Sequence, residues 1–119
     1  MSKQLPTIAM TPLPEYGYDP IPLILSGEKV HTLREQRHHG RKEVTVNGKR
    51  MGIVVEFTTH KQLEAHQYCT PGFALADGFR GQYPHTKLNS LLTKFYGYCP
   101  NTLICNYFRV VKRPEEVPV

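Results

Sequence analysis

The chain has 119 residues, of which 39% are hydrophobic and 21% are charged, with a formal net charge of +5. These values are typical of a folded protein with one core, and they exclude a disordered chain. No apolar run approaches the roughly 18 residues of a membrane helix, and the first 20 residues hold no apolar segment typical of a secretory leader. We therefore expect one domain that does not contact a membrane.

The first 20 residues contain four of the ten prolines and predict an extended arm, residues 1–19, that is laid over the domain or left mobile. Proline removes a backbone donor and disfavours helix in the residue before it. Residues 21–26 are predicted to form a short helix that ends at Gly27, since glycine accepts the left-handed conformation of a helix stop. Residues 29–34 alternate in polarity and predict a strand.

The stretch EVTVNGKRMGIVVEFTTH, which follows a predicted polar and basic loop over residues 35–42, contains the clearest local pattern. Two β-rich runs flank Asn47-Gly48, the dipeptide that a type I′ hairpin turn favours because both central residues need positive φ. Gly52 in the second run predicts a bulge in a curved sheet. Residues 61–83 are rich in turn formers, with a short helix expected over 74–79.

The stretch PHTKLNSLLTKFYG predicts an amphipathic helix that begins near Pro84 and ends at Gly97. Its apolar stripe, which we expect to enter the core, consists of Leu88, Leu91, Leu92, Phe95 and Tyr96. Residues 102–111 predict a buried strand, and residues 112–119 a tail. About five strands with two or three helices predict an α+β fold, in which the helices pack against a small curved sheet or barrel.

Residues 31–50 carry six basic residues against two glutamates, and so hold +4 of the net charge of +5. The basic residues are Arg34, Arg37, Arg41, Lys42, Lys49 and Arg50. Such a segment attracts polyanions, nucleic acid above all, although a solvated hairpin face has the same composition. Aromatic residues near predicted loops, which can stack on a base or pack half-buried, are Tyr16, Tyr18, Tyr83, Tyr98 and Phe79.

Cysteine and histidine patterns do not indicate a metal site. Cys69, Cys99 and Cys105 are odd in number and too few for a disulfide framework, which favours free thiols in a cytoplasmic protein. Cys105 lies in an apolar strand and is expected in the core. The histidines lack the paired spacing of zinc ligands, and no glycine-rich phosphate loop is present. We expect no cofactor.

Three short motifs carry a family resemblance. Gly27-x-Lys29-x-x-Thr32-x-Arg34 follows the first helix, ALADGF comes later, and KFYG ends the amphipathic helix. Over residues 20–111 this pattern resembles the ASCH domain family of PUA-like barrels, whose first strand carries G-x-K-T-x-x-x-R. The resemblance implies a small β-barrel with a polar cleft that binds RNA or a modified nucleoside.

One bacterial branch of that family looks like an amidohydrolase that removes the acetyl group from N4-acetylcytidine with a lysine, a threonine and a glutamate. The resemblance implies that Thr32 is the nucleophile, Lys29 its base and Asp77 the residue that orients or transfers protons. A partly desolvated lysine of lowered pKa can activate a hydroxyl. Arg34 can hold a carbonyl or phosphate oxygen. Val30 and Asp77 depart from the family's threonine and glutamate.

Two non-catalytic alternatives remain open. Residues three apart on a regular strand point to opposite faces, so Lys29 and Thr32 meet only if Lys29 lies in the turn after Gly27 or if a bulge intervenes. Without this convergence, Lys29 and Arg34 would act with the other basic residues of 31–50 in an RNA-binding module. The third possibility is an adaptor whose basic face meets an acidic protein.

Overall fold

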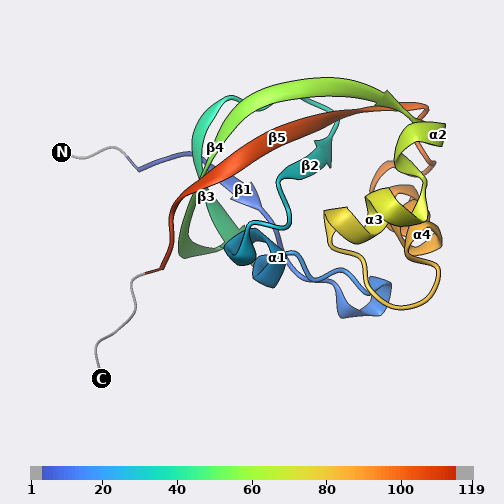
Figure 1. Ribbon diagram of the computed structural model, residues 1–119, viewed down its shortest axis with the longest axis horizontal. Helices are drawn as coiled ribbons and strands as arrows, with labels where there is room; N and C mark the ends of the chain where they lie inside the picture. Colours follow the sequence, from blue (N-terminus) through green and yellow to red (C-terminus); the bar gives the residue numbers. More distant parts are fainter. Residues whose placement is uncertain (1–3, 115–119) are drawn as a thin grey trace.

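The computed structural model describes residues 4–114, and its centre is a five-stranded sheet in the order β1-β3-β4-β5-β2. The strands are β1 (Thr7–Ala9), β2 (His31–Arg34), β3 (Gly40–Val46), β4 (Lys49–Glu64) and β5 (Thr102–Lys112). All neighbours are antiparallel except β1 and β3, which are parallel. The sheet curls into a half-barrel, with the long strands β4 and β5 arching over the helices (Figure 1). The predicted α+β fold is confirmed.

Between residues 4 and 114, four α-helices and one 3-10 turn accompany the sheet. They are α1 (Ile21–Ser26), α2 (Ala65–Tyr68), α3 (Pro71–Asp77), α4 (Pro84–Tyr96) and η1 (Pro14–Tyr16). The predictions for α1 and α4 are confirmed. Helix α3 begins three residues before the predicted 74–79, because the Thr70 hydroxyl accepts the Phe73 N–H and caps the helix there. Helix α2 was not predicted, since four residues are too few to show a helical period.

Strand β4 is longer than the sequence indicates. Residues 61–64, predicted to be turns, pair with residues 102–105 of β5. Lys61 and Gln62 are exposed, so this end of the strand has the polar composition of a loop. The predicted loop over 35–42 is wrong at its end, since β3 already begins at Gly40. This start of β3 also has the polar composition of a loop.

The β3–β4 hairpin turns at Asn47 and Gly48, whose φ angles are 52° and 79°, as the type I′ prediction requires. The predicted bulge at Gly52 is confirmed as well. The register between the two strands shifts between Glu43 and Thr45, and Gly52 has a φ of 72°. The Glu43 carboxylate accepts the Gly52 N–H at 3.0 Å, which fixes the bulge.

Two apolar clusters stabilise the ends of the half-barrel. The cluster under α2–α4 consists of Leu33, Leu63, Tyr68, Ala74, Phe79, Leu88, Leu91, Leu92, Leu103 and Cys105. The cluster near α1 consists of Ile8, Met10, Ile24, Val44, Ile53, Val55, Phe57 and Phe108. Ile8 and Met10 come from the predicted N-terminal arm, of which Thr7–Ala9 pairs with β3 and so forms part of the sheet itself. Strand β5 likewise extends to Lys112, the first residue of the predicted tail. Residues 1–3 of the predicted arm and 115–119 of the predicted tail lie outside the described residues.

Two aromatic predictions are wrong. Phe79, expected near a surface loop, is fully buried, because the glycine turn that contains it folds under α3 and α4. Phe95, expected in the core, is 62% exposed, since it sits where the covered stripe of α4 ends. Tyr96 packs against the first cluster as predicted. None of the helices between residues 4 and 114 has the length and apolarity that a membrane crossing requires.

Candidate functional site

The turn after α1 sets the position of Lys29. Gly27 ends the helix with a φ of 83°, a left-handed conformation that glycine adopts without strain. The Lys29 N–H then donates to the Leu23 carbonyl at 2.9 Å, and pairing with β5 begins only at Val30, whose carbonyl accepts the Phe108 N–H. Lys29 therefore lies in the turn and not on the strand predicted over 29–34. Because Lys29 is in this turn, it and Thr32 need not point to opposite faces of one strand.

Lys29 forms a buried ion pair with Asp77. Its Nζ lies 2.6 Å from both Asp77 Oδ1 and the Asp77 backbone carbonyl oxygen. The exposed fractions of the two residues are 1% and 5%. Burial lowers the pKa of Lys29 despite the opposing attraction of Asp77, because an ammonium loses its hydration there. Asp77 ends α3, where the helix dipole disfavours a carboxylate, so its stabilising partner is Lys29.

The glycine turn after α3 holds Asp77 against the segment before α1. Gly78 has a φ of 120°, and a Cβ on it would lie 3.2 Å from the Tyr18 ring and 3.3 Å from Pro20. The Asp19 N–H donates to the Gly78 carbonyl at 2.9 Å. Only glycine combines this backbone angle with such close packing. The Asp-Gly dipeptide thus places a carboxylate beside the lysine of a distant turn.

Arg34 joins the two edge strands of the half-barrel. Thr32 and Arg34 lie two residues apart on β2 and share one face. The Arg34 Nε donates to Thr32 Oγ1 at 3.2 Å, and its Nη2 donates to the Ala9 carbonyl of β1 at 2.6 Å. Since β1 and β2 are the edges of the sheet, this guanidinium spans its open side. The Thr32 hydroxyl accepts from Arg34 and keeps its own proton available to donate.

A cavity of about 300 Å³ lies at this open side, beside α4. Thr32, Arg34, Asp77 and Tyr18 form its polar part. Its remaining lining is largely apolar and consists of Ala9, Thr11, Leu13, Leu33, Phe79, Leu88, Leu91, Leu92, Phe95 and Tyr96. Lys29 stands behind this wall, with Nζ 5.9 Å from the centre of the Tyr18 ring. Thr32 and Asp77 therefore line one cavity, and Lys29 contacts it through Asp77.

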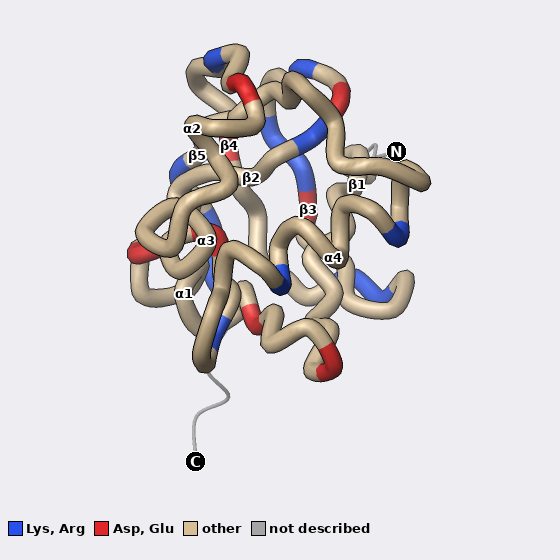
Figure 2. The backbone as a smooth tube through the Cα atoms, turned by 90° about the vertical axis from the view of Figure 1, so that its right-hand side faces the viewer, with Lys and Arg blue, Asp and Glu red and all other residues tan. Residues whose placement is uncertain are grey.

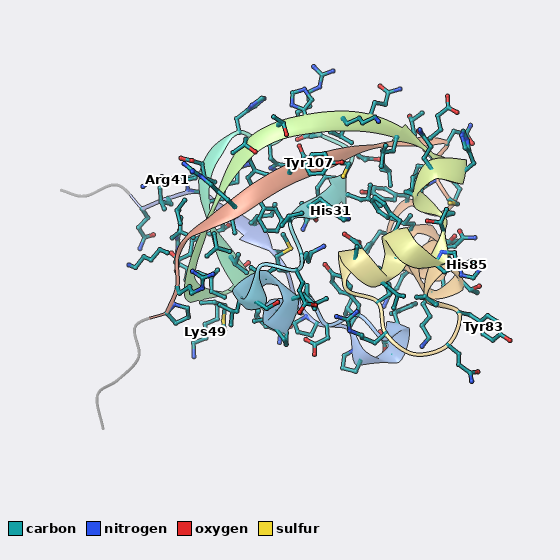
Figure 3. The ribbon with its side chains drawn as sticks, viewed as in Figure 1. His31, Arg41, Lys49, Tyr83, His85 and Tyr107 are labelled. Carbon is teal, nitrogen blue, oxygen red and sulfur yellow. The ribbon has the colours of Figure 1, made fainter. Side chains whose placement is uncertain are left out.

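Most of the basic residues of 31–50 lie elsewhere. Arg34 lines the cavity, whereas Arg41 and Arg50 form ion pairs with Glu56 and Glu43 on the hairpin. The remaining three are Arg37 and Lys49, which are exposed, and Lys42, whose Nζ lies 2.5 Å from His38 Nδ1. Lys and Arg follow one another on β3 in Figure 2, and Arg41 and Lys49 lie at the end of the molecule remote from α4 in Figure 3.

Sequence reasoning gave no site role to His31. Its Nε2 lies 3.6 Å from Asp77 Oδ1, and the residue is 7% exposed. Burial lowers the pKa of His31. A histidine in a short strand has the pattern of an ordinary core residue, so the sequence held no signal for this contact.

A metal centre is not evident in the part of the chain that the structure describes. Within residues 4–114, no three of the histidine, cysteine, aspartate and glutamate side chains are grouped to hold an ion. The three cysteines are free thiols, and Cys105 is buried as predicted.

No family model and no curated protein sequence matches the chain, but solved structures do. A protein from Enterococcus faecalis V583, described under the family model DUF984, has a TM-score of 0.64 at 17% identity, covering 94% of this chain and 80% of its own. The ASCH domain from Lactobacillus crispatus JV V101 has a TM-score of 0.57 at 18% identity, covering 77% and 70%. The chain has the ASCH fold, as the motifs around Lys29 and Asp77 led us to expect.

Proposed function

We propose that this protein binds a single nucleoside, free or within RNA, and hydrolyses an N4-acylated cytosine in the cavity beside α4. The buried Lys29–Asp77 pair, set against a cavity that Thr32 and Arg34 also line, is the observation that carries this proposal. A buried ion pair seldom stabilises a fold more than apolar residues do. A lysine of lowered pKa beside a cavity is instead typical of a functional site.

The size and lining of the cavity support a small, flat ligand. Its volume of about 300 Å³ is at the lower end of the range for ligand pockets, roughly 300–1,000 Å³. Leucines of α4 line the apolar part, while Thr32, Arg34 and Asp77 supply polar groups. A nucleobase has apolar faces and a polar edge, so it matches this division. The ribose would remain near the exposed ring of Phe95.

The proposed reaction is an acyl transfer followed by hydrolysis. Lys29, in its deprotonated form, accepts the Thr32 proton by way of Asp77, which lines the cavity with Thr32. Thr32 Oγ1 attacks the acyl carbon at the same time, and the bond from that carbon to N4 breaks. The proton then passes from Lys29, again by way of Asp77, to the departing N4. Water then cleaves the acyl-threonine ester and releases the carboxylic acid. Arg34, which donates to Thr32 Oγ1, stabilises negative charge on that oxygen.

Turnover of N4-acetylcytidine, followed by chromatography of the cytidine released, tests the proposal. We expect Thr32→Ala to abolish turnover, because the variant has no hydroxyl with which to form the acyl intermediate. Thr45→Ala is the matched control, because Thr45 is also a buried strand threonine but lies on β3, outside the cavity lining. Equal rates in Thr32→Ala and Thr45→Ala would show that Thr32 takes no part in the reaction. Cytidine binding without turnover would leave a nucleoside-binding protein, and no binding would refute the proposed ligand.

A non-catalytic RNA-binding role is the second candidate, and the charge of residues 31–50 favours it. Exposed Arg37 and Lys49 are available for phosphate contacts, whereas Arg41 and Arg50 already have glutamate partners. Binding driven by phosphate contacts weakens steeply with added salt. Titrating a single-stranded RNA at several salt concentrations tests this role. A flat salt response would exclude it.

A further inference from the structure

One oxygen of Asp77 faces two nitrogen groups. Asp77 Oδ1 lies 2.6 Å from Lys29 Nζ and 3.6 Å from His31 Nε2. The His31 nitrogen is buried and has no hydrogen-bond partner among the described residues. His31 is only 7% exposed, and a buried nitrogen without a hydrogen-bond partner lowers the stability of the fold. Its position beside a carboxylate therefore calls for an explanation.

The His31 ring is fixed by aromatic neighbours from two other elements. Its centre lies 4.6 Å from that of Phe73 on α3 and 6.1 Å from that of Tyr107 on β5. Figure 3 shows the ring under β5, beside Tyr107, in the hollow of the sheet. From 3.6 Å, a shift of less than about 1 Å brings Nε2 to the usual hydrogen-bond distance of about 2.9 Å. The packing therefore holds Nε2 close to Asp77 Oδ1.

We propose that His31 is a positioning residue, whose Nε2–H shares the Asp77 carboxylate with Lys29 and so weakens the hold of that carboxylate on the lysine proton. A carboxylate that accepts from two donors attracts each of them less strongly than one that serves a single donor. His31 then acts on Lys29 without touching it. The proposed hydrogen bond needs only the small shift described above, whereas its use in catalysis rests on the proposed function.

Burial favours a neutral His31 ring by lowering its pKa, and the positive charge of Lys29 acts in the same direction, whereas the negative charge of Asp77 opposes them. The groups that face it are Lys29 from the turn, Asp77 from α3 and Tyr107 from β5. Burial lowers the pKa of His31 and raises that of Tyr107, so both are uncharged near neutral pH. A neutral imidazole has one N–H, and only the tautomer with the proton on Nε2 can donate to Asp77. The pKa of Lys29 also depends on Arg34 and Cys105, and the variants described below leave both residues in place.

The experiment measures the pKa of Lys29 by carbon-13 NMR of its Cε, assigned by comparison with Lys29→Met. His31→Phe keeps the aromatic packing and removes the donor, so we expect the pKa of Lys29 to rise by about one unit, the scale of a hydrogen bond to a charged group. His31→Gln retains an N–H donor and should restore most of the wild-type value. His85→Phe is the matched control, since His85 also has a buried unpaired nitrogen but lies on α4.

Each outcome decides one part of the proposal. An unchanged pKa of Lys29 in His31→Phe, or the same shift in His31→Gln, would overturn it, because packing alone would then explain His31. If His31→Phe does not fold, nitrogen-15 NMR of the wild-type ring identifies the tautomer, and a proton on Nδ1 would overturn the proposal. If N4-acetylcytidine is hydrolysed, the rising limb of kcat/KM should move to higher pH in His31→Phe. A pKa shift without any wild-type turnover would refute the reaction and uphold the hydrogen bond.

Discussion

Lys29 Nζ donates to both the carboxylate and the backbone carbonyl of Asp77, a residue 48 positions further along the chain. This double contact joins the turn after α1 to the last residue of α3. Both residues are almost completely buried. The two charges are therefore mutually dependent, since neither has water as a substitute partner.

Removing one charge of this pair should destabilise the fold strongly. We expect Asp77→Asn to lower the free energy of unfolding by about 3–5 kcal/mol, because Lys29 is left buried without a counter-charge. Adding Lys29→Met should recover more than half of that loss. Denaturant unfolding of the wild-type protein and of these two variants measures both effects. Glu15→Gln is the control, since its pair with Lys94 is exposed and should contribute about 0–1 kcal/mol; an equal loss in Asp77→Asn would contradict the buried pair.

The stability of the protein should depend on pH through His31. Burial lowers the pKa of His31, whereas the unfolded histidine keeps its proton up to about pH 6.5. Between those two values the unfolded chain binds more protons, so the free energy of unfolding rises with pH and falls on acidification. His31→Gln removes this slope. Denaturant unfolding of the wild type and of His31→Gln from about pH 5 to about pH 8 measures the contribution of His31. If the free energy of unfolding changes with pH in the same way in both proteins, the prediction is wrong.

Phe95 should contribute to ligand binding and little to stability. The residue is 62% exposed and yet lines the cavity. Stacking of a base on an aromatic ring contributes about 1–3 kcal/mol, so Phe95→Ala should weaken cytidine binding between about 5- and 150-fold. Calorimetry measures the affinity. Tyr83→Ala is the control, because Tyr83 is also a largely exposed aromatic residue, at 69%, but lies outside the cavity lining. Matching affinities in the two variants would count against a stacking role.

Local patterns predicted the local structure. Asn47-Gly48 predicted its turn because the turn needs two positive φ angles, and the leucine stripe predicted α4. Predictions failed where distant contacts decide. The stripe gives the apolar face of α4 but not the point at which a cavity replaces the core, so Phe95 was misplaced. The polar end of β4 pairs with β5 despite its composition, because Leu63 is buried in the first apolar cluster while Lys61 and Gln62 stay exposed.

The site was predictable only in part. The motif resemblance named Lys29, Thr32 and Asp77, and the structure brings Lys29 and Asp77 into contact, with Thr32 and Asp77 lining one cavity. The resemblance could not reveal His31 near Asp77, because that approach depends on how α3, which carries Phe73 and Asp77, packs against the His31 ring of β2. The chain charge likewise indicated a basic segment without showing which cations have glutamate partners.

Gly27 and Gly48 allow the turn before Lys29 to be tested against a matched turn elsewhere. Their φ angles are 83° and 79°, and a Cβ on either would meet no atom within 4 Å. Alanine at each position should therefore cost only backbone strain, about 1–2 kcal/mol of unfolding free energy. Gly27→Ala alone should also weaken cytidine binding several-fold, because the turn at Gly27 directs Lys29 towards Asp77. Unfolding and calorimetry on both variants separate the two effects, and equal affinities would show that the position of Lys29 does not depend on this turn.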